Sequence, residues 1–376
     1  MAEKTGKPMI LDLHIPYCVR PERFQNRYFA VGSNEEKNAY LSALKREVLS
    51  YKGDLDEYEI RAVTLSGGSA TVMSPDRLGD LLRTVREELP VSKGVEISVD
   101  AHPLTICTPA LTGIASGHPN RMELIIHSDN QQELETLGCS FTEQHIQNAI
   151  LFFKRFHMNN VGMTISYGIP GQTLHSWMQT LRACSIIHPA HITIQALHAE
   201  KEVPVNDPSE TERRNMYKDA CRFLSENGYL QYSATHFALP HHGWLYQLLM
   251  MEGASCLGMG VGAKSFYDGY VVRNTNNLKR YISNAGDYEK ITAQVSEADD
   301  ETTMQRYVSL RLTSTDGLSR DAFRERFGHD LPPKIEEAME KAALEGLLTI
   351  ADGIFKPTPD GLYDAFSPSS PSSQCL

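Results

Sequence analysis

Short runs of β-branched and aliphatic residues alternate with amphipathic stretches over the first ~200 residues, and this alternation constrains the fold more than any other feature of the sequence. The runs typical of strands cover residues 9–15, 60–65, 95–99, 122–126, 162–167 and 191–197. Apolar residues at helical spacing separate them, most clearly at residues 35–51, 74–89, 142–156 and 174–187. This order predicts parallel strands joined by crossover helices, in an α/β sheet or barrel.

A different pattern follows in the last quarter of the chain. Residues 286–300 are polar and predict a linker, and three amphipathic stretches and a short hairpin pattern come after it. Three helices and a hairpin resemble a winged helix, although its glutamate-rich residues 335–345 favour a packing role over DNA binding. We therefore expect a βα domain over residues 1–200, an extension over 201–290, a helical module over 300–366 and a disordered tail over 367–376.

Charge and cysteine content exclude several classes of protein. The 376 residues carry a net charge of −11, which argues against a dedicated nucleic-acid binder. No apolar run is long enough for a membrane span, and no secretory signal is evident. The seven cysteines are scattered and are typical of reduced thiols in a cytosol. We expect a cytoplasmic protein that acts on a small molecule, without nucleic acid or membrane, either alone or as a homo-oligomer.

Ligands of parallel α/β folds bind where the strands end, so polar residues just after each predicted strand are the candidates for chemistry. His14 and Tyr17 follow the first strand. His102, His127 and Asp129 follow the third and fourth strands and predict an acid–base site. Two structural interpretations stay open, since His14 suits a hydrogen-bonded core position and Tyr17 suits aromatic packing as well as stacking on a flat ligand.

Residues 13–29, with the sequence LHIPYCVRPERFQNRYF, resemble the start of the radical S-adenosylmethionine fold, specifically the oxygen-independent coproporphyrinogen oxidase and haem chaperone family. The resemblance continues at SGGSATVMSP, DAHP, YGIPGQTLHSW, YLQYSATHFA, LGMGVGAKS and RLTSTDGLSRDAFRERFG, in the order of the family's own motifs. It thus covers nearly the whole chain. It implies a partial (β/α)6 TIM-like barrel of the radical S-adenosylmethionine type, with a C-terminal helical, winged-helix-like module.

The cluster motif departs from the family pattern. The resemblance places the three ligands of a [4Fe–4S] cluster at Cys18, Glu22 and Gln25, and only the first is a thiolate, the donor that such clusters need. Cys107 and Cys139 lie on other loops of the predicted fold and would have to converge on Cys18 by coincidence. We therefore expect no [4Fe–4S] cluster and no other metal.

The contacts that the resemblance implies for S-adenosylmethionine are only partly preserved. The corresponding positions here are Ser66, Gly67, Gly68, Asp100, Tyr167, Gly168, Ile169, Pro170 and Gln172. Cys139 stands where the family has an arginine that pairs with the ligand carboxylate, and Thr164 where it has an aspartate. Loss of an arginine–carboxylate pair costs roughly 2–5 kcal/mol. Weak or rearranged binding is the expectation.

Haem or a porphyrin is the other ligand that the resemblance implies. The HNxxYW-like segment of haem chaperones is not preserved in residues 240–246, which read PHHGWLY. His241, His242 and Cys18 are the candidate iron ligands by residue type. The alternative for the two histidines is a solvated surface turn.

Three functions are compatible with these features. The sequence favours a cluster-less enzyme that binds S-adenosylmethionine or a related small molecule for non-radical methyl transfer or cyclisation, as in natural-product biosynthesis, because the pocket loops keep polar residues. The second is a chaperone-like protein that binds haem or a porphyrin. The third is a catalytically inactive scaffold for a partner protein.

Overall fold

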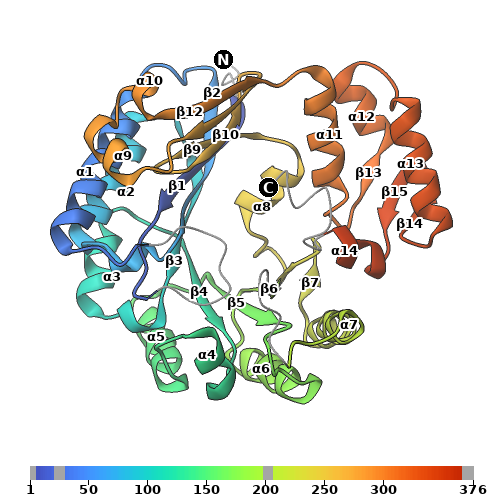
Figure 1. The fold of residues 1–376 in the computed structure, drawn as a ribbon, viewed down its shortest axis with the longest axis horizontal. Coiled ribbons are helices and arrows are strands. Elements are labelled where there is room, and N and C mark those ends of the chain that lie inside the picture. The colour runs from blue at the N-terminus through green and yellow to red at the C-terminus, as the bar shows by residue number, and fades with distance from the viewer. Residues whose placement is uncertain (1–5, 21–29, 198–205, 366–376) are drawn as a thin grey trace. The chain divides into compact units, whose positions relative to one another are not determined.

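A computed structural model describes residues 6–20, 30–197 and 206–365 (Figure 1). Contacts divide the chain into two compact units, one of residues 1–165 with 254–297 and the other of residues 166–253 with 298–376. The ranges predicted above, 1–200, 201–290 and 300–366, follow changes of pattern along the sequence, whereas these units follow proximity in space. The tail at 367–376 lies outside the described residues.

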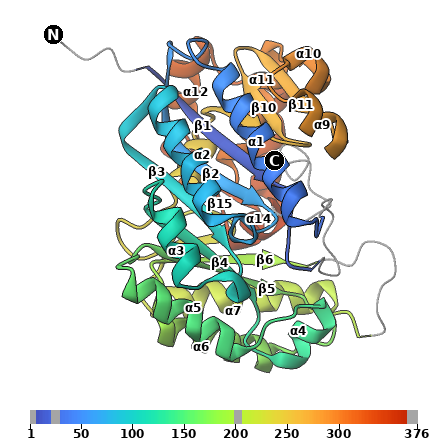
Figure 2. The same cartoon turned by 90° about the vertical axis from the view of Figure 1, so that its left-hand side faces the viewer.

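The first unit is built on parallel strands in chain order. They are β1 (Lys7–Ile15), β2 (Tyr58–Gly67), β3 (Val91–Ala101), β4 (Arg121–His127) and β5 (Val161–Tyr167), whose last two residues begin the second unit. The connecting helices are α1 (Asn34–Ser50), α2 (Pro75–Glu88), α3 (Thr108–Ala115), α4 (Gln131–Leu137) and α5 (Glu143–Arg155), with the short 3-10 turns η1 (Ala70–Val72) and η2 (Pro103–Thr105). Figure 2 shows α1, α2 and α3 side by side over β1 to β3. The predicted α/β class is confirmed.

The sheet continues on the other side of β1. Strand β9 (Ser255–Met259) pairs parallel to β1, and β10 (Lys264–Tyr267), β11 (Tyr270–Asn274) and β12 (Thr292–Glu297) follow antiparallel, with α9 (Leu278–Asn284) and α10 (Tyr288–Ile291) between the last two. The predicted linker over residues 286–300 is therefore wrong. Strand β12 lies at the sheet edge with its side chains mostly exposed, so it needs no apolar alternation.

The second unit contains three strands that pair antiparallel, together with several helices. Its strands are β6 (His191–Ala196), β8 (His236–Ala238) and β7 (Leu230–Gln231), and its helices are α6 (Leu174–Ile187), α7 (Glu210–Glu226) and α8 (Leu245–Met251). Strands β7 and β8 are not one continuous strand. The Ser233 hydroxyl accepts hydrogen bonds from the amides of Thr235 and His236, and this turn separates β7 from β8.

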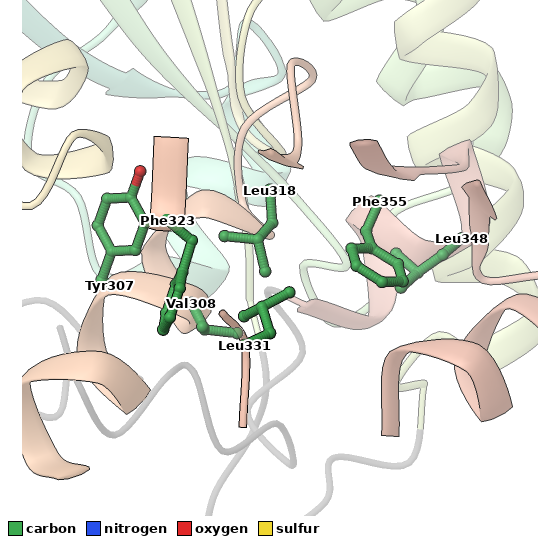
Figure 3. Close-up of a cluster of buried hydrophobic side chains, with 7 residues drawn as sticks. All are labelled: Tyr307, Val308, Leu318, Phe323, Leu331, Leu348 and Phe355. Carbon is green, nitrogen blue, oxygen red and sulfur yellow. The ribbon is translucent and has the colours of Figure 1, made fainter. Parts of the chain in front are cut away.

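The C-terminal module has its own apolar core. Helices α11 (Asp300–Arg311), α12 (Arg320–Phe327) and α13 (Pro333–Leu344) pack with a sheet of β13 (Leu318–Ser319), β15 (Ile354–Pro357) and β14 (Leu348–Ala351). Figure 3 shows the core residues, Tyr307, Val308, Leu318, Phe323, Leu331, Leu348 and Phe355. The last helix, α14 (Pro359–Ala365), is held to α7 because Arg214 pairs with Asp360 and Asp364. A helical, winged-helix-like module was predicted and is found.

No helix in the described part of the chain combines the length and apolarity that a membrane span requires.

A buried carboxylate connects three parts of the first unit. Glu47 of α1 accepts hydrogen bonds from the Gly260 amide at 2.8 Å, from Asn274 Nδ2 at 2.8 Å and from the Tyr281 hydroxyl. Its side chain is almost wholly buried, and burial raises the pKa of Glu47 above its ordinary value despite these three hydrogen bonds. The carboxylate therefore joins α1 to the turn after β9, to β11 and to α9. We call these four residues the Glu47 cluster.

We expect the Glu47→Gln variant to be less stable than the wild type, by about 1–3 kcal/mol near pH 5, because an amide can accept hydrogen bonds on one oxygen only. The wild-type carboxyl holds its proton more tightly in the folded state, so its contribution is full below its ordinary pKa of about 4.3 and decreases as the pH rises. The stability gap should therefore narrow between pH 5 and pH 8. Urea unfolding of both proteins at the two pH values measures it, and a gap that widens with pH would contradict the raised pKa.

Candidate functional site

A pocket opens in the first unit where β1, β2 and β3 end. Its volume is about 420 Å³. Apolar side chains form much of its lining, and two thiols, two hydroxyls and one ammonium group supply its polar atoms. The lining residues are Cys18, Val19, Lys37, Thr71, Val72, Pro75, Leu104, Thr105, Cys107, Pro109 and Ala110.

A series of hydrogen bonds joins the loops that follow these three strands. The Ser69 amide donates to the Tyr17 carbonyl at 2.8 Å, and the Ser69 hydroxyl lies 3.0 Å from that of Thr71. The Thr71 hydroxyl lies 2.6 Å from that of Thr105 and accepts from the His102 amide at 3.0 Å. These bonds fix the bases of the three loops relative to one another, so the pocket is preorganised by short polar side chains.

The glycine turn after β2 packs directly against the end of β1. A Cβ atom on Gly67 would lie 2.5 Å from the His14 ring, and one on Gly68 would lie 2.1 Å from the Tyr17 carbonyl oxygen. Gly67 has a φ of +109°, and the Gly68 amide donates to the Ile15 carbonyl at 2.6 Å. Both glycines are therefore required by the packing of β1 on β2, whether or not a ligand approaches them. Their neighbour Ser66 donates to Asp12 at 2.7 Å.

The end of β1 is itself held by α1. The Tyr40 hydroxyl donates to the His14 carbonyl at 2.6 Å and accepts from the Val261 amide at 3.2 Å. The Tyr17 ring stands edge-on to the Tyr40 ring, with centroids 5.5 Å apart, and is fully buried. His14 is half-buried. Thus the predicted residue Tyr17 packs as an aromatic core side chain at the back of the Cys18 loop.

The three predicted acid–base residues lie at the ends of neighbouring strands. His102 begins η2, and its Nδ1 accepts the Leu104 amide at 3.2 Å, which assigns the proton to Nε2. His127 ends β4, buried, with a φ of +57° that side-chain-bearing residues seldom adopt. Asp129 is half-buried, and burial followed by the charge of Glu143 raises the pKa of its carboxyl.

Asp100, another predicted ligand contact, lies in β3 opposite Glu123 of β4. The Thr164 hydroxyl donates to Glu123 at 2.8 Å, so the position where the family has an aspartate now serves a buried carboxylate of the sheet. Sequence position does not predict the hydrogen bond between Thr164 and Glu123, because both residues lie within strands and not after them.

The turn at residues 167–172 belongs to the second unit. The Gln172 side chain accepts the Gly168 and Ile169 amides at 2.8 and 3.3 Å and donates to the Ser166 carbonyl at 3.2 Å. Pro170 is buried with them, and the Tyr167 ring packs at 5.8 Å from that of Trp177. Burial raises the pKa of Tyr167 well above its usual range. The Gln172 side chain thus makes its hydrogen bonds within this turn.

Sequence reasoning missed three polar residues of the pocket, namely Lys37, Thr105 and Cys107. Cys107 had been placed on a separate loop, away from Cys18, yet the two thiols line the same pocket. Thr71 lies in the glycine-rich motif itself, and position after a strand was the one signal that could have indicated Thr105 and Cys107.

The described residues do not fit a [4Fe–4S] cluster. Such a cluster needs three thiolates here, and the pocket lining supplies two. Within residues 6–20, 30–197 and 206–365, no group of three or more histidine, cysteine or acidic side chains could hold a metal ion. Glu22 and Gln25 lie outside the described residues.

Comparisons with known proteins agree with the fold. Residues 298–363 match the HemN C-terminal domain family. Heme chaperone HemW of Lactococcus lactis subsp. lactis (strain IL1403) is 22% identical over 85% of this chain and 86% of its own, and anaerobilin synthase of Escherichia coli O157:H7 is 27% identical over 75% and 66%. The solved coproporphyrinogen III oxidase (HemN) of Escherichia coli, a radical SAM enzyme, superimposes with a TM-score of 0.83 at 19% identity, over 98% of this chain and 90% of that one.

These matches confirm the resemblance that the sequence motifs indicate, to the coproporphyrinogen oxidase and haem chaperone-like family of radical S-adenosylmethionine proteins. Compared with that family, the chain has Glu22 and Gln25 at two of the three positions where the resemblance places cluster cysteines.

Proposed function

We propose that this protein binds haem or a related tetrapyrrole and carries it, without iron–sulfur cluster chemistry. The pocket at the ends of β1 to β3 is the observation that carries this proposal, since it combines an apolar lining with two thiols and an ammonium group. Several relatives that align over most of the chain are named heme chaperone HemW. Non-radical methyl transfer or cyclisation, which the sequence had favoured, has no such support.

Each part of a tetrapyrrole finds a chemical counterpart in this pocket. Haem iron takes thiolate and imidazole ligands, and Cys18 and Cys107 are the thiols of the pocket. The apolar lining suits the macrocycle, whose burial supplies the main free energy of binding. Lys37 suits a carboxylate substituent of the ring. His241 is exposed and His242 half-buried in the second unit, so both stay as further candidate ligands.

The proposal leaves two expectations as they stood. Cytoplasmic location and a homo-oligomeric state are still predictions, and no nucleic-acid or membrane partner is part of the proposal.

Titration with haemin tests the thiols. We expect the wild type to develop a Soret band at one equivalent, and the Cys18→Ala and Cys107→Ala variants to bind at least about tenfold more weakly, equal to about 1.4 kcal/mol, or with a shifted band. Cys221→Ala is the matched control, because that thiol lies in α7, outside the pocket. Unchanged affinity and spectrum in both pocket variants would remove this pocket as the haem site, and an effect in His241→Ala or His242→Ala would place the site in the second unit.

The proposed ion pair between Lys37 and a carboxylate of haem is tested by comparing haemin with its dimethyl ester. We expect Lys37→Ala to raise the Kd for haemin about two- to fivefold, the range of a partly exposed ion pair. The dimethyl ester of haemin lacks the charged carboxylates, and its Kd should be the same for the variant and the wild type. An equal loss of affinity for both ligands would show that Lys37 acts through packing, and no loss for either would exclude it from the site.

A second candidate function is cluster-independent binding of S-adenosylmethionine, which the retained turn Ser66–Gly67–Gly68 favours. The fit is partial. The Gly68 amide already bonds to the end of β1 and the Ser69 amide to the Tyr17 carbonyl. Gln172 bonds to its own turn, and Cys139 offers no cation to a carboxylate. When bound, S-adenosylmethionine would supply an electrophilic methyl group.

Calorimetric titration of S-adenosylmethionine into metal-free protein, purified in air, separates the two candidates. We expect no binding with a Kd below about 100 μM, since the charge-assisted contact of the missing arginine is worth about 2–5 kcal/mol. Micromolar binding that is lost in Asp100→Asn would favour the second candidate instead.

A further inference from the structure

We propose that two copies of this protein associate through an edge of the sheet in the first unit, by antiparallel pairing of their β12 strands about Val295. The partner is thus a second copy of this chain. The proposal is independent of the proposed function, because no residue that lines the pocket at the ends of β1 to β3 lies in β12.

Strand β12 ends the sheet on its side of the first unit. In the described part of the chain it pairs with β11 and with no further strand. In an antiparallel strand, the amide and carbonyl of every second residue point away from the partner strand. The side chains of residues 293–297 are all exposed. The outer side of β12 therefore offers a row of backbone donors and acceptors to another strand.

The edge lacks the devices that usually prevent such pairing. Edge strands are commonly protected by lysine, by proline or by an irregular backbone. The sequence of β12, TAQVSE, contains neither lysine nor proline, and Glu297 is its charged residue. The register shift in its pairing with β11 lies between Arg273 and Asn274, opposite the start of β12. Residues 294–297 therefore keep a regular register and remain open to a further strand.

Apolar side chains gather on one face beside this edge. The Val295 side chain is 58% exposed and lies directly opposite Val272 of β11. Tyr270 is 46% exposed and lies on the same face as Val272, because alternate residues of a strand share a face. Apolar side chains grouped beside an open strand edge favour cover by another chain.

A second copy extends this apolar group across the edge. A twofold axis perpendicular to the sheet through Val295 places this residue opposite its own copy. Directly opposed residues of paired strands lie on one face, with their Cβ atoms about 4.5–5.5 Å apart. Val272, Val295 and the same two residues of the other copy then form one continuous row across four strands.

The charges of the strand also suit pairing with itself. In the register about Val295, Gln294 lies opposite Ser296 and Ala293 lies opposite Glu297, so no like charges face each other. The two copies of Glu297 lie about 14 Å apart along the strands, beyond the Debye length of about 8 Å. An axis through Glu297 would instead bring two carboxylates directly opposite each other. The edge is therefore its own complement in the register about Val295.

The size of this interface sets its expected strength. Pairing of one short strand from each copy is small beside the roughly 1,200–2,000 Å² of a standard stable interface. We therefore expect a dimer with a Kd of about 10–100 μM. Each copy carries a net charge of −11, so added salt should strengthen the dimer by screening the repulsion between copies.

Sedimentation velocity of the full-length protein at about 1–200 μM covers this range of Kd. We expect the wild type to shift from monomer to dimer as its concentration rises. The Val295→Lys and Val295→Glu variants each place like charges opposite each other on the axis, and each should stay monomeric. An equimolar mixture of the two should dimerise, because lysine then faces glutamate. Leu151→Lys is the matched control, since this α5 side chain is equally exposed at 58%, and it should dimerise as the wild type does.

Each contrary outcome is distinct. A wild type that stays monomeric at every concentration overturns the proposal, and so does a stable complex with a different protein in place of the dimer. A dimer that persists in both Val295 variants places the interface elsewhere. Variants that stay monomeric even when mixed overturn pairing about Val295, provided that circular dichroism shows both to be folded. Haemin titration of the same variants reports on the proposed function separately, and we expect wild-type affinity in both.

Discussion

The buried carboxylate of Glu47 is the interaction on which the rest of the first unit depends. It holds the turn at Gly260, the end of β11 and helix α9 to α1 through three hydrogen bonds. Two turns earlier in α1, Tyr40 bonds to the His14 carbonyl and packs on Tyr17. The same helix thus fixes β9 and β1, which are paired in register, and β1 leads directly to Cys18. A buried carboxyl group that satisfies three donors specifies this arrangement more narrowly than apolar packing would, because each donor must meet a particular oxygen.

Sequence reasoning predicted the fold well wherever burial imposes a regular spacing of apolar residues along a strand or helix. Strands β1 to β6 and helices α1, α2, α5 and α6 were found close to their predicted positions, since strands joined by crossover helices in a parallel sheet are apolar and amphipathic in the expected way. The exceptions have a common physical cause. Strand β12 is an exposed edge, and β7 and β8 are separated by a turn at Ser233, so neither region shows the alternation of a half-buried strand.

The candidate site was harder to predict because its residues make hydrogen bonds and packing contacts within the chain that a sequence motif does not show. His102 caps η2 through Nδ1, Gln172 closes its own turn, and Gly67 and Gly68 make room for β1. Gln172, Gly67 and Gly68 match family positions, yet each of them, like His102, is explained by contacts inside the chain. Cys107 is the opposite case, because it matches no motif and shares the pocket with Cys18. The chain folds so that loops distant in sequence meet where the strands end, and spacing along the chain cannot report that meeting.

The contacts of Gly67 and Gly68 weaken the inference from the retained glycine turn to binding of S-adenosylmethionine. In a protein that binds S-adenosylmethionine, a turn with two glycines gives a ligand close access to the backbone. On sequence alone, its presence here favours that cofactor. The His14 ring and the Tyr17 carbonyl already occupy the space beside both glycines, so the turn would be needed for folding even after the ligand was lost. Gly67 and Gly68 are therefore explained by the packing of β1 on β2, and their retention alone does not require a bound cofactor.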